Sequence, residues 1–61
     1  MADPTALAKL RHDLSNPLSA ILAETQLLLL AAEKFDEETV ASLRQIEQMA
    51  RKMRQTLQSI E

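Results

Sequence analysis

Four residues near the start of the sequence have types and a spacing that could support chemistry, namely His12, Asp13, Asn16 and Pro17. A neutral imidazole is a nucleophile near pH 7, and a carboxylate that accepts a hydrogen bond from one ring nitrogen leaves the other free to attack phosphorus. Asp13 is the candidate carboxylate, but neighbouring residues of a helix point about 100° apart, so its side chain would have to reach round. Asn16 lies one helical turn after His12 and covers the same patch of surface.

The same spacing also fits plainer interpretations. His12 could be an ordinary surface residue of an amphipathic helix, and Asp13 a solvated neighbour. Asn16 could be a polar residue that happens to precede a proline. Pro17 could lack any role, although a proline inside a helix removes one hydrogen bond and destabilises the helix by about 3 kcal/mol. Spacing alone therefore leaves both chemistry and an inert helical surface open.

The composition predicts one small helical domain over residues 1–61. The chain has no glycine and no cysteine, only two prolines and one aromatic residue, and it is rich in strong helix formers. A core in a chain this short supplies only about 3–5 kcal/mol, and disulfides cannot add to it. A single histidine without cysteines does not favour a structural zinc site. Association with another chain is the remaining source of stability.

Charge and hydropathy argue against several function classes. Seven basic and nine acidic residues give a net charge of −2, which lacks the basic footprint of a nucleic-acid-binding protein. The longest apolar run, residues 27–32, is far shorter than the ~20 residues that a membrane span needs, so we expect no membrane contact by this segment. The first residues lack the apolar core of a signal peptide. We expect a cytoplasmic segment, although a longer parent protein could be membrane-anchored.

Two helices must position the four residues. Asp3 and Pro4 form a helix-start signal, which predicts a first helix over about 4–33. Asp36 is a natural N-cap for a second helix over about 37–60, and Glu37 and Glu38 suit the positive end of its dipole. Because the connection is so short, the two helices must fold back as an antiparallel hairpin.

Each predicted helix carries an apolar seam with steps of three and four residues. In the first helix one step is out of phase, and it spans Pro17, where a kink is expected. His12 falls on the outer face, nearly opposite the seam, and we expect it to face water. The apolar stripes are too wide for one partner helix, so the fold class predicted is an all-α hairpin that dimerises into a four-helix bundle. The seam positions are Leu7, Leu10, Leu14, Leu18, Ile21, Thr25, Leu28 and Ala32 in the first helix and Leu43, Ile46, Ala50, Met53, Leu57 and Ile60 in the second.

The order of residues in "HDLSNPL" resembles the H-box of the dimerisation and histidine-phosphotransfer domain of sensor histidine kinases. That pattern has histidine, an acidic residue, an apolar one, commonly a basic one, then Thr or Asn, proline and an apolar residue. Ser15 departs from it, because the family often has Arg or Lys there. This departure puts in doubt any contact that the basic residue would make with phosphate or with an acidic partner.

The resemblance implies roles for the four residues. His12 would be the phosphoacceptor, Asp13 an acid or base, and Asn16 a phosphatase-linked residue that orients water. Pro17 would loosen the helix so that His12 can meet two partners. One partner would be a catalytic domain that carries ATP, and the other the receiver domain of a response regulator. The chain itself would bind no cofactor.

Residues 1–61 contain none of the glycine-rich nucleotide motifs of an ATP-binding domain. We therefore expect part of a histidine protein kinase that is not active alone. Two alternatives remain open at this point. One is a structural helical-hairpin oligomerisation module without chemistry, and the other is a standalone phosphorelay protein that exchanges phosphate only with receiver domains.

Overall fold

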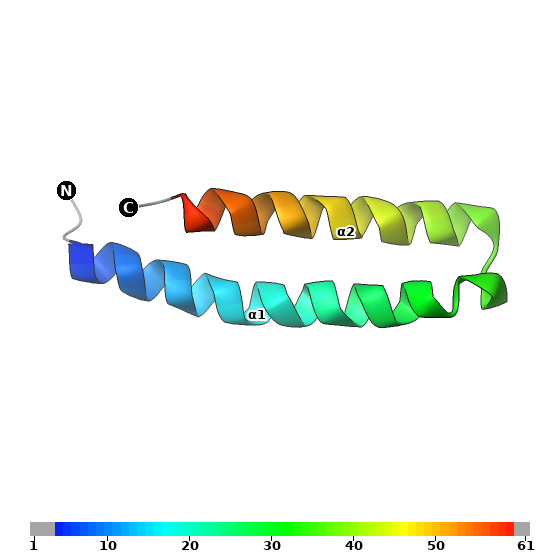
Figure 1. Ribbon diagram of the computed structural model, residues 1–61, viewed down its shortest axis with the longest axis horizontal. Coiled ribbons are helices and arrows are strands. Elements are labelled where there is room, and N and C mark those ends of the chain that lie inside the picture. The colour runs from blue at the N-terminus through cyan, green and yellow to red at the C-terminus, as the bar shows by residue number, and fades with distance from the viewer. Residues whose placement is uncertain (1–3, 60–61) are drawn as a thin grey trace.

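The protein is an antiparallel hairpin of two helices. The computed structural model describes residues 4–59, in which α1 spans Pro4–Leu30, a short 3₁₀ helix η1 spans Ala32–Lys34, and α2 spans Glu37–Gln58. Figure 1 shows α2 returning alongside α1, so that the end of α2 lies near the start of α1. The molecule is 47 Å long and 14 by 12 Å across. The all-α hairpin expected from the sequence is confirmed.

The first helix ends three residues before the expected boundary of about residue 33. Ala31 leaves the helical region, with φ −108° and ψ 35°. The amides of Lys34 and Phe35 then donate to the carbonyls three residues earlier, Ala31 and Ala32, at 2.9 and 3.1 Å. Because the chain has no glycine for a left-handed helix end, it reverses direction through this tighter 3₁₀ turn.

The second helix begins at the predicted cap. Asp36 has extended backbone angles, and its Oδ1 accepts a hydrogen bond from the Thr39 amide at 2.7 Å. Hydrogen bonding from the Thr39 side chain, together with this bond from its amide, lowers the pKa of the Asp36 carboxyl from its ordinary value. At the other end, the amide of Ser59 donates to the Gln55 carbonyl at 3.1 Å. The predicted cap Asp3 and the predicted last helical residue Ile60 lie outside the described residues.

The hairpin has a thin core. Leu18 and Leu22 of α1 are buried against Ala50 and Leu57 of α2, with 4–9% of each residue exposed. Thr25 is the polar member of this buried seam, at 5% exposure. Its hydroxyl donates to the Ile21 carbonyl at 2.7 Å. The buried hydroxyl therefore has the hydrogen-bond partner that burial requires.

Only part of the predicted apolar seam faces the partner helix of the same hairpin. Leu7, Ala32 and Leu43 are half-buried. Six further seam positions keep large exposed fractions because one antiparallel neighbour cannot cover the whole stripe, and Met49 beside the seam is exposed as well. We call these exposed apolar side chains the open face: Leu10, Leu14, Ile21, Leu28, Ile46, Met49 and Met53.

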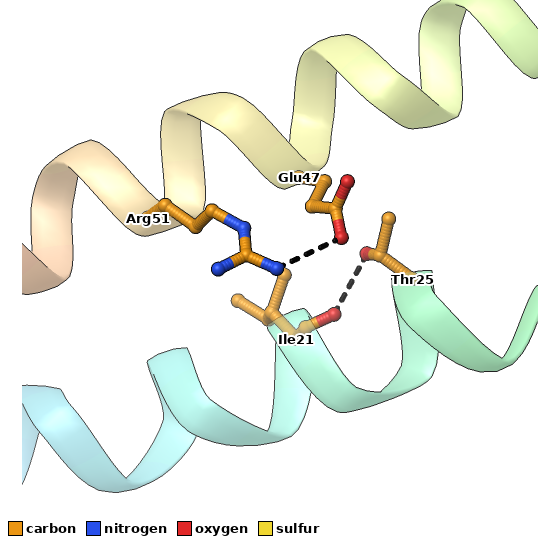
Figure 2. A network of polar contacts seen from close by, with 4 residues as sticks. All are labelled: Ile21, Thr25, Glu47 and Arg51. Atoms are coloured by element: carbon orange, nitrogen blue, oxygen red, sulfur yellow. Dashed lines mark hydrogen bonds and ion pairs between the residues drawn. The ribbon is translucent and has the colours of Figure 1, made fainter. Parts of the chain in front are cut away.

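Polar side chains also reach into the space between the helices. Glu47 and Arg51 lie one turn apart on α2, and Arg51 Nη2 donates to Glu47 Oε2 at 3.3 Å. Figure 2 shows both side chains extending toward the part of α1 that carries Ile21 and Thr25. Only 22% of the Glu47 side chain is exposed, and that of Arg51 is 51% exposed. The middle of the hairpin therefore carries polar side chains beside its apolar core.

Candidate functional site

His12 lies on the outer face of α1 and is exposed, as the helical geometry predicts. The buried seam of α1 begins beyond it, at Leu18 and Leu22. The imidazole is therefore not buried in the apolar core of the hairpin. An exposed neutral imidazole offers a ring nitrogen lone pair to an incoming electrophile.

A surface hollow lies beside His12 and joins the two helices. Its lining contains Arg11 and Ser15 of α1 and Gln58 of α2. Arg11 and Ser15 are half-buried, and Gln58 is exposed. Ala8, Arg11, His12 and Ser15 share one side of α1 because residues three and four apart lie on the same helix face. The antiparallel return of the chain adds Gln58 to this group.

Asp13 is engaged with a residue other than His12. Lys9, one turn earlier on α1, donates from Nζ to Asp13 Oδ2 at 2.9 Å. The Lys9 side chain is 76% exposed and that of Asp13 is 53% exposed. An ion pair this exposed is worth only about 0.2–1 kcal/mol, so Asp13 can leave it readily. The acid or base role of Asp13 stays a prediction.

Asn16 and Pro17 follow His12 by about one turn, and both are exposed. Pro17 lies inside α1 and has no amide hydrogen to donate to the Asp13 carbonyl. In Figure 1 the N-terminal part of α1, drawn in blue to cyan, is inclined to the remainder of the helix. The missing hydrogen bond provides a physical cause for a bend at this point.

An apolar groove runs between the helices on the open face. Pro17, Leu14 and Ile21 line it from α1, and Met49 and Met53 line it from α2. Exposed contiguous apolar surface of this kind marks a binding interface in soluble proteins. His12 is not part of the lining of this groove, so a partner that covers the groove leaves the imidazole exposed on the outer face.

Sequence reasoning did not identify Arg11 and Gln58 as members of the site. Arg11 directly precedes His12. Because Arg11 and Ser15 are four residues apart, the sequence could have predicted that they share one helix face. Gln58 had no such signal, because its position beside His12 depends on the register of the two helices. That register follows from the turn at residues 31–36.

Residues 4–59 include neither a helix that could span a membrane nor a cluster of metal-binding side chains. Neither helix combines the length and apolar character that crossing a bilayer requires. The same residues contain no group of three or more His, Cys, Asp or Glu side chains that could hold a metal ion.

Comparison with known families identifies the class of protein. The sequence pattern of the His Kinase A (phospho-acceptor) domain matches residues 5–61, nearly the whole chain. The hairpin is thus a phosphoacceptor and dimerisation module of the histidine kinases of two-component systems. The chain belongs to the His Kinase A (phospho-acceptor) domain family. Neither the curated proteins nor the solved structures compared with the chain gave a match.

Proposed function

We propose that His12 accepts a phosphoryl group from ATP that is held by a separate catalytic domain. The lone pair of an imidazole nitrogen forms a bond to the γ-phosphorus, the bond from this phosphorus to the bridging oxygen breaks, and ADP leaves with that electron pair. The remaining ring proton is stabilised by or passed to a carboxylate, and Asp13 is the nearest one in the sequence. Because ATP is the donor, the proposal places this segment in the cytoplasm.

The second half of the proposed reaction passes the phosphoryl group to a response regulator. A carboxylate oxygen of a receiver-domain aspartate attacks the phosphorus, and the imidazole leaves with the electron pair of the P–N bond and regains its proton. Asn16, exposed one turn after His12, would orient water for hydrolysis of the resulting aspartyl phosphate. Pro17 would let this part of α1 adjust to each partner.

The open face supports a homodimer. Leu10, Leu14, Ile21 and Met53 are between 47% and 57% exposed, and burying such side chains against a second copy gains about 25 cal/mol for each Å² removed from water. The hairpin core by itself is small. Two hairpins that pair through this face form a four-helix bundle, in which both His12 side chains stay on the outside.

The exposed position of His12 on the outer face of α1 is the observation that carries the proposal. The test supplies the chain with a histidine-kinase ATP-binding domain and ATP labelled in the γ-phosphate. We expect protein-bound label that is acid-labile and base-stable, as a phosphoramidate is. His12→Gln removes the label while circular dichroism shows unchanged helix content. Addition of a receiver domain then moves the label to that domain.

Two outcomes would contradict this function. Absence of label on a folded, dimeric chain would favour a purely structural oligomerisation module. Label that arrives only from a phosphorylated receiver domain, and never from ATP, would favour a standalone phosphorelay protein.

The dimer has its own test with a matched control. Met53→Glu places a charge in the groove of the open face, whereas Gln55→Glu places the same residue type at an exposed position that does not line the groove. Sedimentation equilibrium should show dimers for the unchanged chain and for Gln55→Glu, and a weakened dimer for Met53→Glu. Equal self-association of the two variants would exclude this face as the interface.

A further inference from the structure

We propose that the hollow beside His12 is a phosphoryl-binding site in which Arg11 holds the oxygens of the phosphorylated imidazole, with Ser15 and Gln58 as additional donors. This inference rests on His12 being the phosphoacceptor. The nucleophile His12 would thus lie next to a binding site for the phosphoryl group, and both helices of one hairpin would form that site.

The lining of the hollow has the chemistry that a phosphoryl group requires. A phosphoryl group carries close to two negative charges and three strong acceptor oxygens. Arg11 offers a guanidinium with five N–H donors in a planar fork, Ser15 a hydroxyl, and Gln58 an amide NH₂. No carboxylate lines the hollow among the residues that the structure describes, so the polar side chains of the lining include donors for a bound anion.

The geometry directs Arg11 rather than Lys9 to this role. Lys9, the other cation on this part of α1, is not part of the lining of the hollow, whereas Arg11 is. Arg11 is half-buried and lines the hollow, and its planar guanidinium loses less conformational freedom per hydrogen bond than an ammonium does. A guanidinium can also engage two phosphoryl oxygens at once.

Gln58 makes the site dependent on the hairpin. It is the last residue of α2, and it lines the hollow together with His12 because α2 runs back alongside the N-terminal part of α1 (Figure 1). The phosphoryl group would therefore contact both helices. An isolated α1 peptide would hold it with one helix only.

The test phosphorylates His12 chemically with phosphoramidate, without any kinase domain, in the whole chain. The ³¹P chemical shift is then followed against pH to give the second pKa of the phosphoryl group. A guanidinium next to the dianion favours the charged form, so Arg11→Gln should raise this pKa by about 0.5–1. Arg11→Lys should keep most of the effect. Arg44→Gln removes an equal charge from a side chain outside the hollow and should leave the pKa unchanged.

The outcomes separate this inference from the proposed function. Equal phosphoryl pKa values in Arg11→Gln and Arg44→Gln overturn the site while leaving phosphorylation of His12 by ATP untouched. Failure of phosphoramidate to modify His12 also counts against it, because a hollow that accommodates a phosphoryl group should admit so small a reagent. With labelled ATP and the ATP-binding domain, a lower initial rate in Arg11→Gln together with an unchanged phosphoryl pKa would mean that Arg11 acts on the donor, and would overturn the assignment.

Discussion

Lys9 and Asp13 form an exposed ion pair of 2.9 Å that runs along α1 past His12. Asp13, which follows His12 in the sequence, thus pairs with a lysine one helical turn before it, on the solvent-exposed surface of α1. The pair keeps the Asp13 carboxylate at the exposed surface of α1 and outside the core. It also allows the contribution of the carboxylate to be measured separately from that of its partner.

If Asp13 acts as acid or base, Asp13→Asn should slow phosphorylation of His12 by about 10²-fold or more, as for general acid or base residues elsewhere. Lys9→Gln should change the rate little, since it removes only a weak surface partner. The initial rate of label transfer from ATP, measured with a separate ATP-binding domain, distinguishes the two. Similar rates for Asp13→Asn and the unchanged chain would rule out the assigned role.

Pro17→Ala should straighten α1 and stabilise it. The alanine amide can donate to the Asp13 carbonyl, and the clash of the proline ring is removed, so the free energy of unfolding should rise by up to about 3 kcal/mol. We also expect an altered ratio of kinase to phosphatase activity. Denaturant titrations and label transfer in both directions measure these effects. Ser19→Ala, an exposed change later on the same helix, is the control, and unchanged stability and activities in Pro17→Ala would contradict the prediction.

Thr25→Val should be neutral or stabilising by up to about 1 kcal/mol, because it removes a donor together with its need for a partner. The Thr25 hydroxyl is buried and donates to the Ile21 carbonyl, which keeps the ordinary helical amide as its partner. Thr56→Val is the matched control, since Thr56 makes the same type of bond to the Lys52 carbonyl at an exposed position. Urea denaturation compares them. Strong destabilisation by Thr25→Val alone would show that the hydroxyl has a further role.

The cap at Asp36 should make stability depend on pH in the acid range. Its pKa is lowered in the folded chain by the hydrogen bonds from Thr39, so folding favours the ionised carboxylate. The contribution is complete above the ordinary pKa of 3.8 and is lost as the pH falls through the lowered value.

Asp36→Ala should accordingly lower the thermal midpoint at neutral pH, and its difference from the unchanged chain should shrink in strong acid. Asp36→Asn keeps a capping oxygen that does not titrate, so it should remove the pH dependence of the cap and preserve most of its stabilisation. Thermal melts followed by circular dichroism at both extremes provide the measurement. A difference between Asp36→Ala and the unchanged chain that is constant over this range would contradict the linkage.

The features set by neighbouring residues could be predicted from the sequence. The cap at Asp36, the helical hairpin and the exposure of His12 depend on short-range spacing and on the apolar pattern. The end of α1 could not be predicted, because residues 31–34 are strong helix formers and only the need to reverse direction ends the helix there. The pattern also could not divide the seam, since a leucine that is buried within its own hairpin and one that stays exposed have the same spacing. Leu18 and Leu14 illustrate the two cases.

This division of the seam has an evolutionary consequence. Leu18, Leu22 and Leu57 are buried within the hairpin, whereas Leu14, Ile21 and Met53 are exposed on the face that the proposed homodimer would cover. Substitutions in the second group can change which chains recognise one another while the hairpin and the histidine stay in place. Duplicated genes that encode such hairpins could diverge in this way into signalling proteins that do not mix within one cell.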